Sequence, residues 1–379
     1  MAGIYIHIPF CKQACHYCDF HFSTNQLLTL QLCEAIVTEL QLQKDYLNGE
    51  AVKTIYFGGG TPSLLTSKEL EIILTAISRH FNIDARAEIT LEANPDDLTA
   101  EKLLGLIQVG INRLSIGIQS FDPEVLKFLN RAHDAESALT CVSLARDAGF
   151  DNLSIDLIYS IPGQSNDAWR KNLNQAIQLS PEHISSYSLS IEEKTTFGHW
   201  QRTGKLKATD EELAAQQFEI VMEELELAGY EHYEISNFSK PGFHSRHNSS
   251  YWEQQYYLGV GPSAHSYNGN TRQFNVLNNH LYIKSLADHK ISFELEILTA
   301  ANKINEYIFT TLRTSRGCDL LKLKREHGYE IETINPGYLN KIIKNKLATV
   351  ENDIIKLTRS GKLLADKIAS DLFAEEIQN

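Results

Sequence analysis

Three cysteines near the start of the chain are the residues whose spacing most clearly indicates chemistry. Cys11, Cys15 and Cys18 stand at C-x3-C-x2-C spacing directly after a short apolar run. A loop with thiolates at these offsets can ligate three irons of a cubane, whereas ordinary cluster proteins bring a fourth cysteine. The neighbouring sequence offers no fourth cysteine, so one iron would be free to bind a small molecule. The spacing therefore predicts a [4Fe–4S] cluster with an open coordination position.

Two other interpretations of this loop stay open. A zinc site needs four nitrogen or sulfur ligands, usually in paired C-x2-C spacing, and His7 or His16 could complete it. A disulfide framework would require an oxidising compartment. The remaining cysteines, Cys33, Cys141 and Cys318, are scattered, which fits a reducing compartment better. Because three cysteines crowd into one tight loop, the cluster is the favoured interpretation.

Composition limits the class of protein. The chain has 379 residues, of which 42% are hydrophobic and 22% charged, as in ordinary globular proteins. This length predicts a barrel-sized domain plus a smaller one. No apolar run reaches membrane-spanning length and the N-terminus lacks the pattern of a signal peptide, so we expect a cytoplasmic protein with no integral membrane segment. A net charge of −13 argues against a nucleic-acid partner.

Up to residue 200, short apolar runs alternate with segments of helical period, which is typical of β–α units and a parallel sheet. The predicted strands are residues 3–8, 52–57, 87–92, 112–117, 153–159 and 183–189. The predicted helices are residues 27–45, 67–79 with Ser67 as N-cap, a segment ending near 108, 123–130, 135–148 and 166–178. Six β–α units make an incomplete barrel, which opens wider than a closed one of eight.

Polar residues gather where the predicted strands end. The cluster loop follows the first strand and the glycine run 58–60 follows the second, while Glu92 ends the third. Gln119 follows the fourth strand, and Asp156 lies inside the fifth among apolar residues. Ligands of such sheets bind beyond the carboxyl ends of the strands. Asp156 also demands a partner there, because an unpaired buried carboxylate is costly.

Several side chains at this edge suit a polar ligand, although each has a simpler explanation. Gly59 and Gly60 let a ligand approach the backbone and Thr61 adds a hydroxyl, but a tight turn also needs glycine. Arg131 can bind a carboxylate through two parallel hydrogen bonds, but an arginine after a helix is usually a surface cation. Glu92 can bind an ammonium or a hydroxyl, but an acidic residue there is often solvated.

Seven motifs, taken in order, resemble the radical S-adenosylmethionine (SAM) family of oxygen-independent coproporphyrinogen III oxidases, and within it a haem-chaperone branch. The motifs are residues 5–11, 58–62, 92–95, 113–121, 130–131, 156–163 and 259–264. Their order and spacing make the resemblance specific, and it covers nearly the whole chain. It implies an α/β fold, a partial (β/α)6 barrel with an accessory C-terminal domain, that holds a [4Fe–4S] cluster and SAM.

The resemblance also implies roles for individual residues. Cys11, Cys15 and Cys18 would hold the cluster, and the amino and carboxylate groups of SAM would occupy the open iron. The backbone of Ile158 would contact the adenine, with Tyr17 packed nearby. The complete set implied for SAM is Tyr5, Tyr17, Gly59, Gly60, Thr61, Glu92, Gln119, Arg131, Asp156 and Ile158. No catalytic residue is implied beyond these.

Three features favour the chaperone branch over the oxidases. The oxidases carry a further cysteine two positions after the third, where this chain has Phe20, and they extend farther upstream of the cluster motif. Residues 247–252 match the HNxxYW pattern of the chaperone branch. We therefore expect a haem chaperone that transfers haem to an acceptor protein. The alternative is an oxidase that decarboxylates the propionates of coproporphyrinogen III and needs an electron donor for SAM cleavage.

The HNxxYW segment offers groups that suit haem. His247 could ligate the iron axially while Tyr251 and Trp252 contact the porphyrin. A histidine beside aromatic residues is also often structural. His244, Tyr256 or His265 could ligate the haem iron in place of His247.

Beyond residue 200 the β–α alternation stops. A helix over residues 210–228 and a strand-like segment over 230–237 precede a glycine-punctuated stretch, 256–267, that we expect to close over the site. These changes predict a barrel domain at 1–200 and an extension of it at 201–290.

The last part of the chain, 291–379, differs in character. Its predicted elements are helices at 300–312, 320–327 and 336–345, a β-ribbon from residue 353 and a helix to Phe373. This order indicates a mainly helical, winged-helix-like domain. A mildly basic run at 322–346 is diluted by acidic neighbours, so we expect a packing or docking domain. A homodimer is one of the oligomeric states left open.

Overall fold

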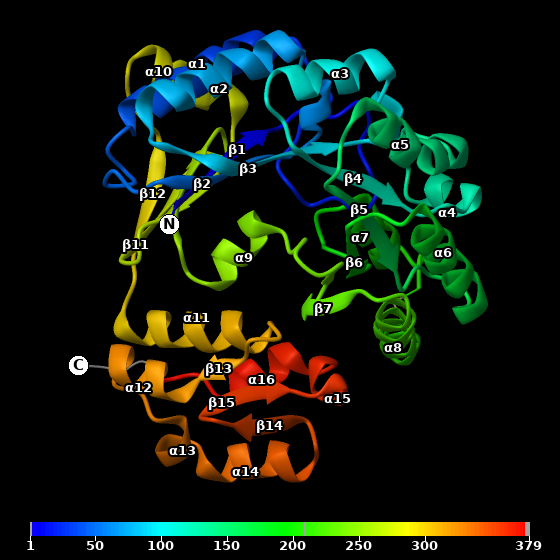
Figure 1. The fold of residues 1–379 in the computed structure, drawn as a ribbon, viewed down its shortest axis with the longest axis vertical. Coiled ribbons are helices and arrows are strands. Elements are labelled where there is room, and N and C mark those ends of the chain that lie inside the picture. The colour runs from blue at the N-terminus through cyan, green and yellow to red at the C-terminus, as the bar shows by residue number, and fades with distance from the viewer. Residues whose placement is uncertain (1, 208–209, 376–379) are drawn as a thin grey trace.

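The computed structural model describes residues 2–207 and 210–375, and its larger sheet is an open, curved layer with helices along its outer side (Figure 1). The twelve strands of this sheet follow the order β12-β11-β10-β9-β1-β2-β3-β4-β5-β6-β8-β7. The first six strands pair in parallel and are β1 (Ala2–Ile8), β2 (Val52–Gly59), β3 (Ile83–Ala93), β4 (Arg113–Gln119), β5 (Leu153–Tyr159) and β6 (His183–Ser188). The prediction of six β–α units is confirmed.

The helices between these strands cover the outer side of the sheet (Figure 1). They are α1 (Thr29–Leu42), α2 (Ser67–His80), α3 (Ala100–Gln108), α4 (Pro123–Phe128), α5 (Ala135–Ala148) and α6 (Asn166–Leu179), with short 3-10 turns η1 (Pro62–Leu64) and η2 (Pro95–Asp97). The prediction of Ser67 as the N-cap of α2 is wrong. Thr66 caps the helix through a capping box with Glu69, because its hydroxyl and the Glu69 carboxylate satisfy each other's backbone N–H groups.

Further elements extend the sheet beyond the six units at both edges. They are α7 (Thr196–Arg202), α8 (Glu211–Leu227), β7 (Glu231–Glu234), β8 (Asn237–Ser239), α9 (Arg246–Trp252), β9 (Tyr256–Val260), β10 (His265–Tyr267), β11 (Thr271–Asn275), α10 (Asn279–Ala287) and β12 (Phe293–Ile297). The hairpin β7–β8 pairs with β6, and β9 pairs in parallel with β1. Helix α9 lies on the inner side of the curve (Figure 1).

The stretch 256–267 is part of the sheet rather than a cover over the site, so that expectation is wrong. Its glycines serve close packing between chain segments. A Cβ on Gly261, where φ is 103°, would lie 2.5 Å from the His7 carbonyl oxygen. Strand β9 can therefore continue directly beside β1.

The C-terminal part forms a second layer with its own apolar core below the sheet (Figure 1). Its elements are α11 (Ala300–Leu312), β13 (Cys318–Asp319), α12 (Leu320–His327), α13 (Ile331–Ile334), α14 (Pro336–Lys344), β14 (Ala348–Glu351), β15 (Ile354–Leu357), α15 (Arg359–Lys362) and α16 (Ala365–Asp371). Three short strands pair in the order β13-β15-β14. The predicted helices and β-ribbon are present. Within the described residues, no helix is both long and apolar enough to span a bilayer.

Candidate functional site

A cavity of about 560 Å³, called here the main cavity, opens at the carboxyl ends of the parallel strands. Every predicted SAM or cluster residue except Tyr5 lies along its wall. These residues are Cys11, Cys15, Tyr17, Cys18, Gly59, Gly60, Thr61, Glu92, Gln119, Arg131, Asp156 and Ile158. Residues more than 140 positions apart in sequence therefore meet at one edge of the sheet.

The cluster loop is fixed by hydrogen bonds at its base and at its tip. At the base, the Ser23 N–H donates to the Pro9 carbonyl oxygen over 2.6 Å, and the Cys11 N–H donates to the Ser23 carbonyl oxygen over 3.0 Å. At the tip, the Asn130 side-chain amide donates to the Ala14 carbonyl oxygen over 2.7 Å. The loop after β1 is thus held closed and tied to the segment after α4.

All three thiols of the loop are free and partly buried. Burial raises the pKa of Cys11, although a hydrogen bond with the Thr61 hydroxyl opposes the effect, and burial raises the pKa of Cys18 to about 11. No group of three potential ligands among the described residues is arranged around a single metal ion. Three thiols on one loop beside the main cavity suit a cubane, because a cubane binds each thiolate through a separate iron and keeps it deprotonated.

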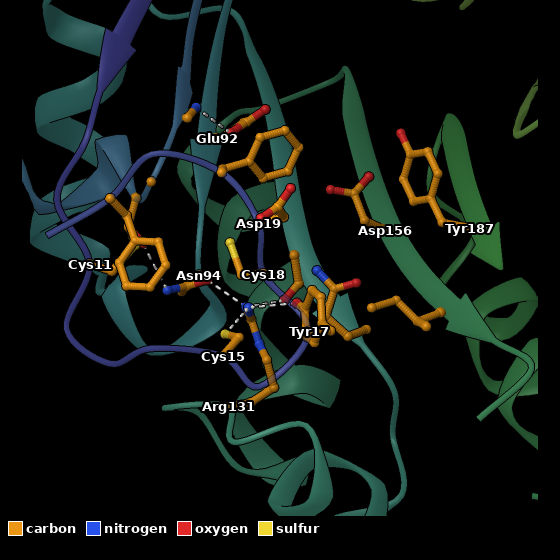
Figure 2. A pocket seen from close by; sticks show the side chains of 18 of the residues that line it. Cys11, Cys15, Tyr17, Cys18, Asp19, Glu92, Asn94, Arg131, Asp156 and Tyr187 are labelled. Carbon is orange, nitrogen blue, oxygen red and sulfur yellow. Dashed lines mark hydrogen bonds between the residues drawn. The ribbon is translucent and has the colours of Figure 1, made fainter. Parts of the chain in front are cut away.

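Arg131 lies beneath the cluster loop and is bonded to several elements at once (Figure 2). Its Nη1 donates to Cys15 Sγ and to the Tyr17 hydroxyl oxygen, both over 3.3 Å. Its Nη2 donates to Asn94 Oδ1 over 2.6 Å and to the Gly117 carbonyl oxygen over 2.8 Å. The buried Nε has no partner in the described part of the chain. Arg131 therefore lines the main cavity and is not a surface cation.

Two carboxyl groups, Glu92 and Asp156, line the main cavity. Glu92 accepts hydrogen bonds from the Tyr56 hydroxyl over 2.8 Å and from the Gly59 N–H over 3.1 Å. Asp156 accepts a long bond, 3.5 Å, from the Ser115 hydroxyl, and a hydrogen bond with the Ser185 side chain also lowers its pKa. Burial raises the pKa of Glu92 to about 7 and that of Asp156 to about 6. Both groups therefore titrate close to neutral pH.

Arg113 is a charge at this site that the sequence analysis did not single out. It begins β4, is 1% exposed and is among the largest fully buried side chains. Its positive charge opposes the raised pKa of both Glu92 and Asp156. The sequence signal that could have identified Arg113 is a charged residue at the start of a mostly apolar strand. Asn94 and Tyr187, which also line the main cavity, were missed too.

The glycine run packs against β1 and the cluster loop. Gly59 has a φ of 107°, and a Cβ there would lie 2.5 Å from His7 Cε1. A Cβ on Gly60 would lie 2.7 Å from the Phe10 carbonyl oxygen, to which the Thr61 N–H donates over 2.7 Å. Gly59 therefore needs to be glycine for its positive φ, as expected for a tight turn. The glycine run also brings the loop after β2 close to the cluster loop beside the main cavity.

The remaining predicted SAM residues divide between two locations. Tyr17 packs in a small apolar cluster that contains Ile158. Gln119 adopts a φ of 64° at the end of β4 and lines the main cavity. Tyr5 points elsewhere, since its ring stacks on Tyr56 with 6.1 Å between centroids and it lines a different cavity.

This second cavity, called here the aromatic cavity, measures about 450 Å³. Its wall combines β1, α9, β9 to β11 and the C-terminal helix α11. Its lining residues include Tyr5, His7, Phe20, Tyr251, Trp252, Tyr257, His265, Tyr267, Arg272, Glu306 and Thr310. Phe20 is 72% exposed and also lines the main cavity, so the two cavities share this side chain.

His247 does not line the aromatic cavity but lies behind its wall, 1% exposed. Its Nδ1 is hydrogen-bonded to the Thr54 hydroxyl over 2.8 Å and its Nε2 to the Tyr251 hydroxyl over 2.8 Å. Burial lowers its pKa to about 3. Both ring nitrogens are engaged, so iron ligation by His247 would first require one of these bonds to break.

The three other candidate iron ligands, His244, Tyr256 and His265, lie in different places. His244 Nε2 lies 2.9 Å from a Glu231 carboxylate oxygen, and the ring stacks on Tyr233 beside another cavity. Tyr256 is exposed at the start of β9. Only His265 of the three lines the aromatic cavity.

Comparison with known proteins identifies the family. Residues 5–176 match the model of the radical SAM superfamily. The chain is 36% identical over 379 residues to the heme chaperone HemW of Bacillus subtilis, covering 99% of this chain and 100% of that one. The chain belongs to the HemW family of radical SAM proteins. HemW of Lactococcus lactis is also 35% identical over 373 residues, covering 98% and 97% of the two chains.

Membership of the HemW family implies a [4Fe–4S] cluster and SAM, as in radical SAM proteins generally. A solved structure supports the fold independently. The coproporphyrinogen III oxidase HemN of Escherichia coli, a radical SAM enzyme, superposes with a TM-score of 0.85 at 23% identity, covering 98% of this chain and 90% of that one. The predicted α/β fold with an accessory C-terminal domain is thereby confirmed.

Proposed function

We propose that this protein is a haem chaperone that carries a [4Fe–4S] cluster and SAM and transfers haem to an acceptor protein. The observation that carries the proposal is the 36% identity to a HemW heme chaperone along the full length of both chains. Phe20, in the position where the resemblance implies a further cysteine in the oxidases, supports the same conclusion.

Cys11, Cys15 and Cys18 hold the cluster in this proposal, since they share one loop on the main cavity. When bound, the cluster supplies one-electron chemistry to SAM. Arg131 binds the SAM carboxylate, and Glu92 and Asp156 bind the ammonium and a ribose hydroxyl, since all three line the main cavity. The remaining contacts to SAM come from Tyr17, Gly59, Gly60, Thr61, Gln119 and Ile158. Tyr5 acts indirectly, because it packs on Tyr56, which donates to Glu92.

The HNxxYW segment forms part of the haem site. Tyr251 and Trp252 supply ring surface to the aromatic cavity, and an aromatic wall suits a porphyrin. His247 holds the Tyr251 hydroxyl and so orients that ring. This role is consistent with the burial of His247.

We assign the barrel to residues 1–200, its extension to 201–290 and the accessory domain to 291–379. The proposed partners are haem and its acceptor protein, together with an electron donor if SAM is cleaved. Cytoplasmic location and a homodimer are part of the same proposal.

The test compares the chaperone with the oxidase directly. Protein with a reconstituted cluster should bind hemin in an absorption titration and should form no protoporphyrinogen from coproporphyrinogen III, SAM and reductant. Robust turnover of coproporphyrinogen III would establish the oxidase instead. Absence of both turnover and hemin binding would reject both functions.

A further inference from the structure

An exposed histidine, His265, lines the aromatic cavity. His265 begins β10, and neither of its ring nitrogens is hydrogen-bonded within the described residues. Its cross-strand neighbour Phe274 meets the ring edge-on, with 4.6 Å between centroids. A strand position and an aromatic contact therefore hold this imidazole at the cavity wall.

The other histidines at this cavity are already engaged. His7 Nδ1 is hydrogen-bonded to the Tyr5 hydroxyl over 3.1 Å, and its Nε2 to the His21 carbonyl oxygen over 3.0 Å. His247 uses both nitrogens behind the wall. Iron ligation needs an imidazole nitrogen with a free lone pair. His265 can provide one without breaking any hydrogen bond seen among the described residues.

The tyrosines at the cavity are weaker candidates for an iron ligand. A phenolate can ligate haem iron, but the Tyr251 hydroxyl is bonded to His247. Burial raises the pKa of Tyr257, and it raises that of Tyr267 to about 12. Forming a phenolate here therefore costs more than using a neutral imidazole.

The cavity also provides a cation for an acidic ligand. Arg272 Nη2 lies 2.8 Å from a Glu306 carboxylate oxygen, and its guanidinium lies 5.9 Å from the Tyr267 ring centroid. A guanidinium has five N–H donors, so this one ion pair leaves capacity for a second carboxylate. The cavity volume, about 450 Å³, is within the range of typical small-molecule sites.

We propose that His265 is the axial ligand of haem bound in the aromatic cavity and that Arg272 binds a haem propionate. The proposal rests on the proposed haem-chaperone function and specifies its site. Because Phe20 lines both cavities, haem in this position lies beside the cluster and SAM. The chain would thus hold its cargo next to its cofactors.

Hemin titration of the cluster-loaded protein tests the assignment. His265→Ala should weaken hemin binding at least about tenfold and shift the Soret band, since the iron–protein bond is lost. Adding free imidazole should restore the wild-type spectrum by filling the vacated position. His280→Ala removes an exposed histidine on α10 and should leave affinity and spectrum unchanged. His247→Ala should keep the wild-type Soret position.

A separate binding measurement tests whether Arg272 recognises a haem propionate. Arg272→Gln should reduce the preference of the protein for hemin over hemin dimethyl ester, because the ester lacks the negative charge that the guanidinium binds. Iron and sulfide content and SAM binding should stay at wild-type levels in every variant.

The outcomes separate this assignment from the function on which it rests. If wild-type protein binds no hemin, both fail. If wild-type protein binds hemin and His265→Ala does so with unchanged affinity and spectrum, His265 is not the ligand and the chaperone function stands. A spectrum altered in His247→Ala and insensitive to imidazole in His265→Ala would also overturn the assignment.

Discussion

At the scale of single residues, the main cavity has an excess of carboxyl groups. Burial disfavours the charged forms of Glu92 and Asp156 and is the main reason for their raised pKa values. The charge of Asp156 raises the pKa of Glu92 further, whereas Arg113 opposes the shift in both groups. A bound ammonium group would do the opposite and favour ionisation. Ligand binding and ionisation of these two carboxyl groups are therefore coupled.

SAM binding should consequently strengthen with rising pH. The pKa values of Glu92 and Asp156 are about 7 and about 6, so both carboxyls are largely protonated at pH ~5.5 and ionised at pH ~8. We expect SAM affinity to rise about tenfold across that range, as measured by equilibrium dialysis with reconstituted protein. Glu92→Gln should weaken binding and flatten the pH dependence, whereas the exposed Glu124→Gln should leave both unchanged. Affinity independent of pH in the wild type would contradict this coupling.

The same pKa shifts predict the opposite trend for stability without ligand. The folded pKa of Glu92 exceeds its ordinary value of 4.5, so the unfolded chain ionises first as pH rises. The free energy of unfolding of the ligand-free protein should therefore fall between pH ~4.5 and ~7. Urea unfolding at several pH values measures this, and Glu92→Gln should show a smaller fall.

At the scale of elements, hydrogen bonds from two other segments hold the cluster loop in place. Its base is closed by Pro9 and Ser23, and its tip is bonded to Asn130. Arg131, the next residue, bonds the thiol of Cys15. The loop after β1 and the segment after α4 therefore position the thiols together, which reduces the entropy lost when a cluster binds.

Each cysteine of this loop should be required for the cluster. Changing Cys11, Cys15 or Cys18 to Ala should reduce bound iron after reconstitution from about four per chain to near zero, because each thiolate ligates a separate iron. Cys33→Ala and Cys141→Ala, in buried positions on α1 and α5, should keep full iron content and lose only about 1 kcal/mol of stability. Iron and sulfide analysis of each reconstituted variant measures its cluster content. Full cluster content in Cys18→Ala would refute the ligand assignment.

At the scale of the whole molecule, the C-terminal domain completes the aromatic cavity through α11, which contributes Glu306 and Thr310. The domain is joined to the barrel extension by backbone bonds from Ile235 N–H to the Arg313 carbonyl oxygen and from Ser315 N–H to the Tyr233 carbonyl oxygen, each 3.0 Å. Movement of this domain would therefore change the aromatic cavity, the proposed haem site, and leave the main cavity intact.

Arg313 is the side chain that should control this docking. Its Nε lies 3.8 Å from buried Glu234, and its guanidinium lies 5.7 Å from the Trp252 ring centroid. Arg313→Ala should destabilise the protein by about 1 kcal/mol, because buried Glu234 loses a nearby cation but keeps its hydrogen bonds from Ser236 and Asn237. Hemin affinity should fall while SAM binding and iron content stay unchanged. Arg325→Ala, which removes an exposed cation on α12, is the matched control. If Arg313→Ala lost hemin binding and SAM binding equally, the prediction that the domain affects only the proposed haem site would be wrong.

The sequence by itself determined the cluster loop, the six β–α units and the edge where the site lies. Cys11, Cys15 and Cys18 are neighbours in the chain, so their spacing alone predicts joint ligation. Glu92 sits near the end of β3 and Asp156 lies inside β5, and parallel strands bring their carboxyl ends to one edge whatever their order. The cysteine spacing was therefore sufficient to predict the cluster loop, and the topology of parallel sheets was sufficient to predict where the site lies.

Tertiary structure alone decided where the HNxxYW histidine points and what forms the second cavity. His247 is bonded to Thr54, which is 193 residues away, and no local pattern reveals that a strand hydroxyl will engage an imidazole. The pairing of β9 with β1 joins residues near 256 to the first residues of the chain, and it sets His265 near Tyr5 and Phe20. Such contacts depend on which surfaces pack together after the strands assemble, because burial and hydrogen bonding between distant segments are set by the whole fold.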